Sequence, residues 1–191
     1  MRSLLKSIFN AVALVFVFPL ALVSGFGRLE ALYVLGAQGL AIYPGLIGDY
    51  LRTAYYHLTL EHYPLNSRIQ FGSFFAHSQA RVGRGVYIGS YCILGRTFIG
   101  DRSQIASGVQ ILSGKQQHGR DVEGRLLGSE HGSFESIVIG CDCWIGAGAI
   151  VMAPIGNQAT IGASSVVTSP IPAGSVAVGN PARVIRSAVE A

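Results

Sequence analysis

A six-residue repeat in the second half of the chain constrains its fold more than any other feature. From residue 82 to 111 and from 139 to 167 an aliphatic residue recurs at every sixth position, apart from two shorter steps, 94 to 99 and 151 to 155. An α-helix repeats every 3.6 residues and a strand every 2.0, so neither produces this period. The period predicts a solenoid in which each hexapeptide forms one short strand and a turn, and three hexapeptides form one coil.

The residues within each hexapeptide indicate which side chains fill the solenoid. The recurring aliphatic residue is expected to point to the axis, where successive coils stack similar side chains. The residue four positions later is small or apolar because it also faces the narrow interior. Glycine commonly follows the aliphatic residue and tolerates a tight turn where a Cβ would crowd the chain. The small or apolar positions are Val86, Cys92, Ser103, Val109 and Ala149.

The first sixty residues differ, and we divide the chain into an N-terminal segment (1–62) and a repetitive domain (63–191). Residues 8–26 and 31–48 carry no charge, although each run is slightly shorter than the ~20 residues that span a bilayer. A signal peptide, a spanning or re-entrant helical hairpin, and a pair of interfacial helices are the three interpretations. We expect membrane association of the second or third kind, because the hydrophobic sequence resumes at once and no clear cleavage site precedes Phe26.

Two further features bear on this segment. Basic residues at both of its ends, Arg2 and Lys6 and then Arg52, agree with both ends lying in the cytoplasm. After Pro44, apolar residues recur at helical spacing and predict an amphipathic helix, which either lies at a membrane surface or caps the next domain. These residues are Ile47, Leu51, Ala54, Tyr55 and Leu58.

Composition excludes other classes. The net charge is +4 and the basic residues are scattered, so a nucleic-acid-binding surface is not expected. The three cysteines, Cys92, Cys141 and Cys143, form no CxxC pair and have no histidine at zinc spacing. We expect buried or edge thiols in a reducing compartment, and no metal site.

The segment IGCDCWIGAGAIVMAPIGNQATIGASSVVTSPIPAGSVAVGNPARVIR (139–186) resembles the C-terminal signature of the hexapeptide-repeat acyltransferases. That family includes galactoside, maltose, serine and xenobiotic acetyltransferases. The earlier stretch GLIGDYLRTAYYHLTLEHY (45–63) is similar to the branch found among bacterial exopolysaccharide O-acetyltransferases. The resemblance implies an all-β fold, a left-handed parallel β-helix, with acetyl-CoA or another acyl-CoA as co-substrate. It also implies a homotrimer with active sites between subunits.

The repeat is interrupted at residues 112–136 by a polar, glycine-rich insertion that contains His118 and His131. Insertions between repeats map to loops, which often lie on the binding face. The resemblance places the family's catalytic histidine at His118, in SGKQQHGRD. An imidazole can accept the proton of an attacking hydroxyl and pass it to the leaving thiolate, so no acyl-enzyme is needed. Asp121 and Glu123 are candidates for orienting its ring, whereas His131 and His77 are expected to be surface or packing residues.

The coils after this loop are implied to bind the coenzyme. By resemblance, Ala147, Gly162 and Ala163 leave room for the pantetheine arm in a groove between neighbouring subunits. Trp144 lines the active-site end of that groove, and Arg183 meets the coenzyme phosphates.

Several alternatives stay open. The γ-type carbonic anhydrases share the solenoid but hold zinc with three histidines, two of them five residues apart, and no such pair occurs here. A non-catalytic scaffold and a sugar-amine acetyltransferase are the others. The hydrophobic segment favours a saccharide acceptor carried on a lipid at the cytoplasmic face of a bacterial inner membrane.

Overall fold

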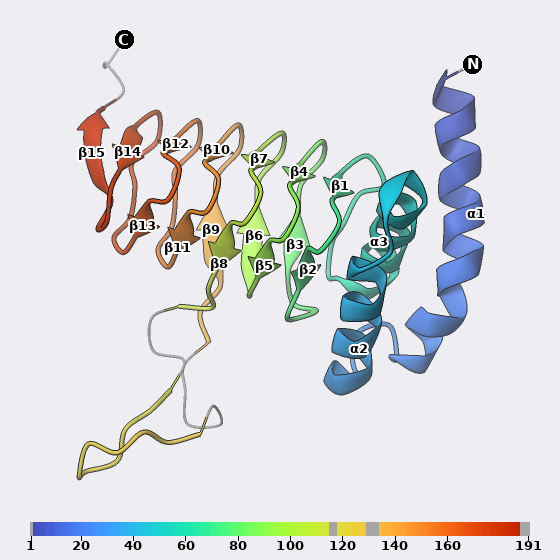
Figure 1. Cartoon of the computed structure of the whole chain (residues 1–191), viewed down its shortest axis with the longest axis horizontal. Helices are drawn as coiled ribbons and strands as arrows, with labels where there is room; N and C mark the ends of the chain where they lie inside the picture. The colour runs from blue at the N-terminus through green and yellow to red at the C-terminus, as the bar shows by residue number, and fades with distance from the viewer. Residues whose placement is uncertain (1, 115–117, 129–133, 188–191) are drawn as a thin grey trace.

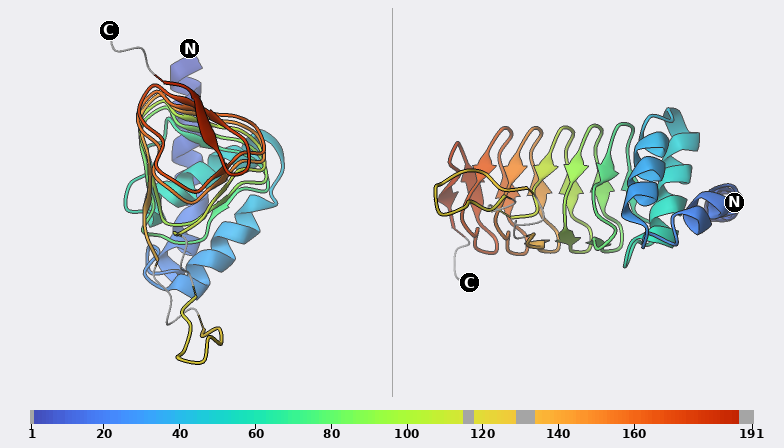
Figure 2. Two further views of the ribbon diagram at one scale, coloured as in Figure 1. Left: turned by 90° about the vertical axis from the view of Figure 1, so that its left-hand side faces the viewer. Right: turned by 90° about the horizontal axis from the view of Figure 1, so that it is seen from below.

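The computed structural model describes residues 2–114, 118–128 and 134–187. Three helices lie at one end, and a triangular β-coil extends from them to the C-terminus (Figures 1 and 2). The helices are α1 (Arg2–Val23), α2 (Glu30–Ala41) and α3 (Gly45–Thr59). The helix α3 starts directly after Pro44, as the apolar spacing predicted.

Each of the first three turns of the coil contributes one short strand to each of three sheets, and the next two turns continue the third side only through isolated bridges at Ile155 and Ile171. The strands within a sheet are parallel, except that β15 is antiparallel to β14. The first sheet contains, in order, β1 (Arg68–Ile69), β4 (Tyr87–Ile88), β7 (Gln104–Ile105), β10 (Trp144–Ile145), β12 (Thr160–Ile161), β14 (Val176–Val178) and β15 (Arg183–Arg186). The second contains β13 (Val166–Val167), β11 (Ile150–Val151), β8 (Gln110–Ile111), β5 (Ile93–Leu94) and β2 (Phe74–Phe75). The third contains β3 (Arg81–Val82), β6 (Thr97–Ile99) and β9 (Ile137–Ile139).

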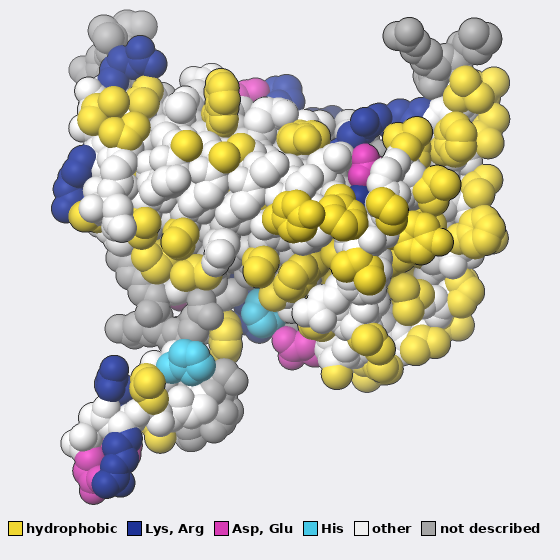
Figure 3. Space-filling model, viewed as in Figure 1, with side chains coloured by type: hydrophobic (Ala, Val, Ile, Leu, Met, Phe, Trp, Pro, Cys, Tyr) yellow, Lys and Arg dark blue, Asp and Glu magenta, His cyan; other side chains and the backbone are white. Residues whose placement is uncertain are grey.

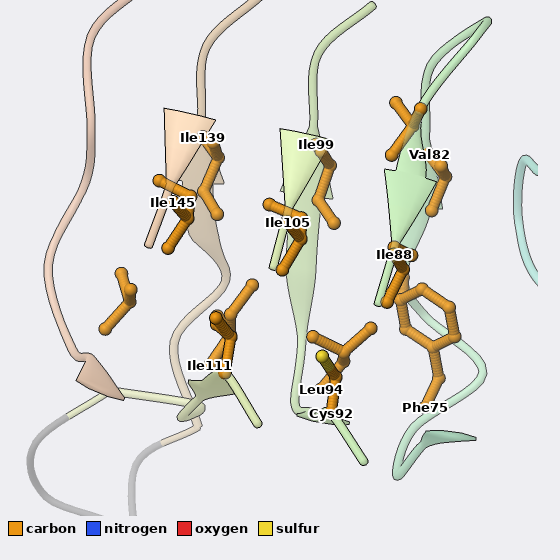
Figure 4. Close-up of a cluster of buried hydrophobic side chains, with 14 of the residues drawn as sticks. Phe75, Val82, Ile88, Cys92, Leu94, Ile99, Ile105, Ile111, Ile139 and Ile145 are labelled. Atoms are coloured by element: carbon orange, nitrogen blue, oxygen red, sulfur yellow. The ribbon is translucent and has the colours of Figure 1, made fainter. Parts of the chain in front are cut away.

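The predicted register of the repeat is confirmed. Ile88 pairs with Ile105, Ile105 with Ile145, and Ile145 with Ile161 along the first sheet. The recurring aliphatic side chains fill the interior (Figure 4). The small or apolar positions are equally buried: Val86, Cys92, Ser103, Val109 and Ala149 are each at most 1% exposed.

Glycine follows the aliphatic residue for a reason that the sequence did not reveal. A Cβ on Gly89 would lie 2.6 Å from the backbone nitrogen of Ser107, and one on Gly146 would lie 2.5 Å from that of Ala163. These contacts belong to the next coil. Glycine is therefore required by the close approach of stacked coils rather than by the turn itself.

The helices close the N-terminal end of the coil. The Tyr33 hydroxyl of α2 donates to the carbonyl of Phe75, 3.1 Å away. Arg52 of α3 is completely buried: its Nε donates to the Ile69 carbonyl at 3.0 Å, and its Nη2 pairs with Asp49 Oδ1 at 2.6 Å. The interpretation of Arg52 as a basic membrane-flanking residue is therefore wrong, because its charge is used inside the cap.

The second uncharged run also serves the cap. The 12-residue helix α2 is about 18 Å long, whereas a bilayer core is about 30 Å thick. Its buried residues Tyr33, Gly36, Ala37 and Ala41 lie against the rest of the protein. A hairpin with two spanning arms does not fit this helix. In the described residues one helix, with the apolar stretch Leu4–Val23, is long and apolar enough to cross a membrane.

Candidate active site and coenzyme groove

His118 lies in the long loop between β8 and β9, which projects from one corner of the coil (Figure 2). Its side chain is exposed. Beyond it the loop folds back on itself through an antiparallel bridge between Arg120 and Leu126. The rigid coil therefore carries an accessible imidazole on an irregular segment, as expected of a catalytic loop.

The two proposed orienting residues are engaged elsewhere. Asp121 Oδ1 accepts hydrogen bonds from the backbone nitrogens of Glu123 and Arg125, both at 2.9 Å. The Glu123 carboxylate pairs with the Arg125 guanidinium at 2.7 Å. Asp121 thus stabilises its own turn, a common use of aspartate that the sequence interpretation overlooked.

The base of the loop is attached to the first coils. The Phe134 ring lies edge-on to His77 at a centroid distance of 5.5 Å, and the Arg96 guanidinium lies 5.7 Å from the same ring. His77 Nδ1 is 3.1 Å from Glu30 Oε1 of α2. The prediction of His77 as a packing residue is confirmed. His131 lies outside the described residues.

Trp144 lies on the outer face of the first sheet. Its side chain is 63% exposed, and it lines a hollow with Tyr87, Gln104, Ile105 and Ala106. Gln104 is its register partner on β7, and Tyr87 pairs with Gln104 in the coil before. Tyr87 and Gln104 were not predicted to line this hollow, although they occupy the same repeat position as Trp144 in the two preceding coils.

The small residues assigned to the coenzyme stack at the corner that follows the first sheet. Ser164 N donates to the carbonyl of Ala147, 2.8 Å away, so the turns after β10 and β12 lie directly against each other. Ala147 and Ala163 are exposed and Gly162 is half-buried. This corner offers peptide groups with little side-chain cover, which suits an extended pantetheine chain.

Arg183 lies in β15 at the C-terminal end of the first sheet. Its side chain is exposed, and its Nη1 donates to the neighbouring Ala182 carbonyl at 3.1 Å. All the predicted coenzyme-binding residues therefore lie on the first sheet or at its edge. They are Trp144 with its hollow, the Ala147–Ala163 corner and Arg183.

One chain does not bring His118 to the other predicted site residues. The loop leaves the corner between the second and third sheets, because it joins β8 to β9. Ala147 and Ala163 lie at the corner between the first and second sheets, because they follow β10 and β12. The loop with the predicted base projects from one corner of the triangle (Figure 2), and the predicted groove lies at another.

Two of the three cysteines are buried in the scaffold, and Cys141 is half-buried. Cys92 and Cys143 are buried, and burial raises the pKa of both thiols. Their Sγ atoms lie 3.2 Å from the Ala106 carbonyl and 3.1 Å from the Gly156 carbonyl. Within the part of the chain that the structure describes, no three His, Cys, Asp or Glu side chains cluster as metal ligands would.

Known acetyltransferases are similar to the chain in sequence and in fold. None of the family profiles compared with the chain matches it. A serine acetyltransferase from Helicobacter pylori is 34% identical over 113 residues, which are 57% of this chain and 58% of that protein. A maltose O-acetyltransferase from Clostridium difficile superposes with a TM-score of 0.68 at 26% identity, covering 83% of this chain and 89% of that one. The resemblance to the hexapeptide-repeat acyltransferases is confirmed.

A further structure adds the coenzyme. A hexapeptide-repeat acetyltransferase from Vibrio cholerae, solved with acetyl-CoA, superposes with a TM-score of 0.69 at 24% identity, covering 85% of this chain and 90% of that one. The chain spans little more than half the length of the curated relatives whose sequences it matches over 109 to 113 residues. Acetyltransferases thus share both its repeat and its three-sheet coil.

Proposed function

We propose that this protein is an acyl-CoA-dependent acyltransferase on a left-handed parallel β-helix, which transfers an acetyl group to a sugar hydroxyl. The observation that carries the proposal is an exposed histidine, His118, in a long loop of the β-coil. Similar sequences and similar coils belong to acetyltransferases. The small-residue corner and the Trp144 hollow support coenzyme binding. A γ-carbonic-anhydrase-like activity has no comparable support, because no three His, Cys, Asp or Glu side chains cluster as ligands within residues 2–114, 118–128 and 134–187.

The proposed reaction needs one base. His118 removes the proton from the acceptor hydroxyl as its oxygen forms a bond to the acetyl carbonyl carbon. The tetrahedral intermediate then expels the coenzyme sulfur, and the imidazolium returns the proton to that thiolate. The products are an acetyl ester and free coenzyme A, and the histidine is unchanged.

We propose that the active site forms between subunits of a homotrimer. The placement of His118 and the Ala147–Ala163 groove at different corners supports this, because a neighbouring coil can supply the second half of the site. A cyclic trimer uses the same heterologous contact three times and forms three identical sites.

The proposed acceptor is a saccharide carried on a lipid, at the cytoplasmic face of a bacterial inner membrane. The apolar N-terminal helices support this location, and cytosolic acetyl-CoA requires the coil to face the cytoplasm. The maltose acetyltransferase relative supports a sugar hydroxyl. An amine acceptor would need the same base, so the product must be identified chemically.

The direct test is thiol release from acetyl-CoA in the presence of mono- and disaccharides. We expect acceptor-dependent thiol release and a product that mild base hydrolyses, as it does esters but not amides. Coenzyme turnover that gives a base-stable product would show an amine acceptor. Failure of the full chain to bind acetyl-CoA in calorimetry would contradict the proposal.

A bulky residue at Ala163 is expected to obstruct the groove. In Ala163→Phe, the apparent KM for acetyl-CoA should rise at least about tenfold, which corresponds to about 1.4 kcal/mol of binding free energy. Ala173→Phe is the matched control, because Ala173 is also exposed and stacks on the preceding coil in the same way. A Cβ added to Gly156 would lie 2.5 Å from the Ala173 nitrogen, just as one added to Gly146 would lie 2.5 Å from the Ala163 nitrogen. Equal KM values in the two variants would exclude Ala163 from the groove.

Mixed oligomers test the position of the site. His118→Ala and Ala163→Phe chains are co-expressed so that they assemble at random into trimers. If each site takes His118 from one subunit and Ala163 from its neighbour, about a quarter of the sites contain both intact residues. Activity at low acetyl-CoA should therefore exceed that of either variant alone. No increase would indicate that both residues act within one subunit.

A further inference from the structure

The outer face of α1 carries a long row of exposed apolar side chains. Val15 and Phe16 are each 74% exposed, and Leu4 is 65% exposed. Side chains of the following turn and of α2 extend this surface. Its other members are Leu5, Ile8, Val12, Phe18, Leu22, Val23, Phe26, Leu29, Leu32 and Leu35. In the space-filling view, hydrophobic side chains cover the helical end of the molecule (Figure 3). Water-soluble surfaces rarely carry a continuous apolar patch of this extent.

The opposite face of α1 holds the helix in place. Ala13, Val17 and Ala21 recur every four residues and are at most 4% exposed, so they form one buried stripe. The Phe9 ring stacks on Tyr50 of α3 at a centroid distance of 5.4 Å. The helix α3 is in turn joined to the first coil through Arg52. The apolar face is therefore a fixed part of the cap.

The direction of α1 decides how the face can meet a membrane. The helix runs across the end of the coil, roughly perpendicular to the axis along which the strands stack (Figure 1). A spanning α1 would have to leave α3 and expose its buried stripe. Lying in the plane of the interface, it keeps its packing and covers its exposed side chains with lipid.

The charges at this end match an anionic surface. Residues 1–29 contain three basic residues, Arg2, Lys6 and Arg28, and no Asp or Glu, and the exposed carboxylate of the next residue, Glu30, lies 3.1 Å from His77 Nδ1. Arg28 is exposed in the turn between α1 and α2. Basic residues beside an apolar helix face are attracted to anionic lipid headgroups, each contributing about 1 kcal/mol near the surface. A protein partner would need a complementary apolar surface, whereas a bilayer accommodates the whole face.

We propose that this face is a monotopic membrane-docking surface: α1 lies flat in the headgroup layer of an anionic bilayer, and the β-coil stands upright on it. This deepens the proposed membrane location by naming the face and the orientation, and its test needs no acyl transfer. The loop that carries His118 leaves the third coil, about 10 Å beyond the first at the usual strand spacing. A saccharide on a membrane lipid then extends from the docking face toward the loop.

Vesicle sedimentation tests the face. The full chain is mixed with phosphatidylcholine vesicles, with and without phosphatidylglycerol. We expect it to sediment with the anionic vesicles, and binding should fall at least about tenfold in Val15→Glu/Phe16→Glu, because two exposed apolar side chains lose their burial in lipid. Ile185→Glu is the matched control: Ile185 is 65% exposed at the opposite end of the coil and should not affect binding. Circular dichroism verifies that each variant is folded.

A second measurement separates lying from spanning. A protease-cleavable tag is placed before Met1, and protease is added outside vesicles to which the protein was bound from outside. Complete cleavage is expected for α1 in the interface plane, whereas a protected tag would show spanning and overturn the proposal. Unchanged vesicle binding by the double variant would also overturn it. The proposal would also be overturned if the double variant lost self-association but kept vesicle binding. That result would show that a second copy of the chain covers the face.

Discussion

Replacing His118 with alanine is expected to lower kcat for acetyl transfer by roughly a hundredfold or more, the usual scale for removing a general base. The side chain is exposed on a loop that leaves the coil, so the thermal unfolding midpoint and acetyl-CoA binding should be unchanged. Steady-state thiol release, measured beside calorimetric titration of acetyl-CoA, separates the chemical step from binding.

The matched control for this variant is His62→Ala. His62 is also exposed, but its backbone bridges Arg81 at the start of the third sheet, away from the loop. Turnover of His62→Ala should stay within about twofold of the unmodified protein. Near-normal turnover of His118→Ala would refute the assignment of His118 as the base.

Replacing Arg52 with leucine is expected to lower the free energy of unfolding by about 3–5 kcal/mol, the range found when one partner of a buried ion pair is removed. The guanidinium donates to the carbonyls of Leu40 and Tyr43 at 3.0 Å and 2.7 Å, in addition to its bond to Ile69 and its pair with Asp49. Leucine restores none of these hydrogen bonds and leaves the carboxylate of Asp49 without its cation. Urea unfolding of the detergent-solubilised full chain measures the loss.

Arg84→Leu provides the comparison for Arg52→Leu. Arg84 pairs with Asp101 at 3.1 Å, but its side chain is 77% exposed, and an exposed pair contributes about 0–1 kcal/mol. Equal losses in the two variants would contradict the structural role of Arg52 in the cap. A larger loss only in Arg52→Leu supports it.

The coil could be predicted from the repeat period, and the coenzyme-binding candidates from the resemblance to a known family. Stacked parallel coils need the same kind of residue at the same place in every hexapeptide, so the period of the inward residues is visible without coordinates. The insertion at residues 112–136 was visible because it interrupts that period. His118 and the residues of the groove followed from the resemblance to acetyltransferases, and the period explains why Ala147 and Ala163 share one corner.

The roles of the helices and of the loop residues could not be predicted from the repeat and became visible in the three-dimensional structure. The sequence does not show whether an arginine after a hydrophobic run flanks a membrane or donates hydrogen bonds to buried carbonyls. The complete burial of Arg52 supports the second role. Likewise, the sequence does not show which groups Asp121 contacts, and in the structure its Oδ1 accepts two backbone hydrogen bonds within its own turn. Burial and hydrogen-bond partners depend on residues far apart in the chain, such as Arg52 and Ile69, and a short-range periodic pattern carries no information about them.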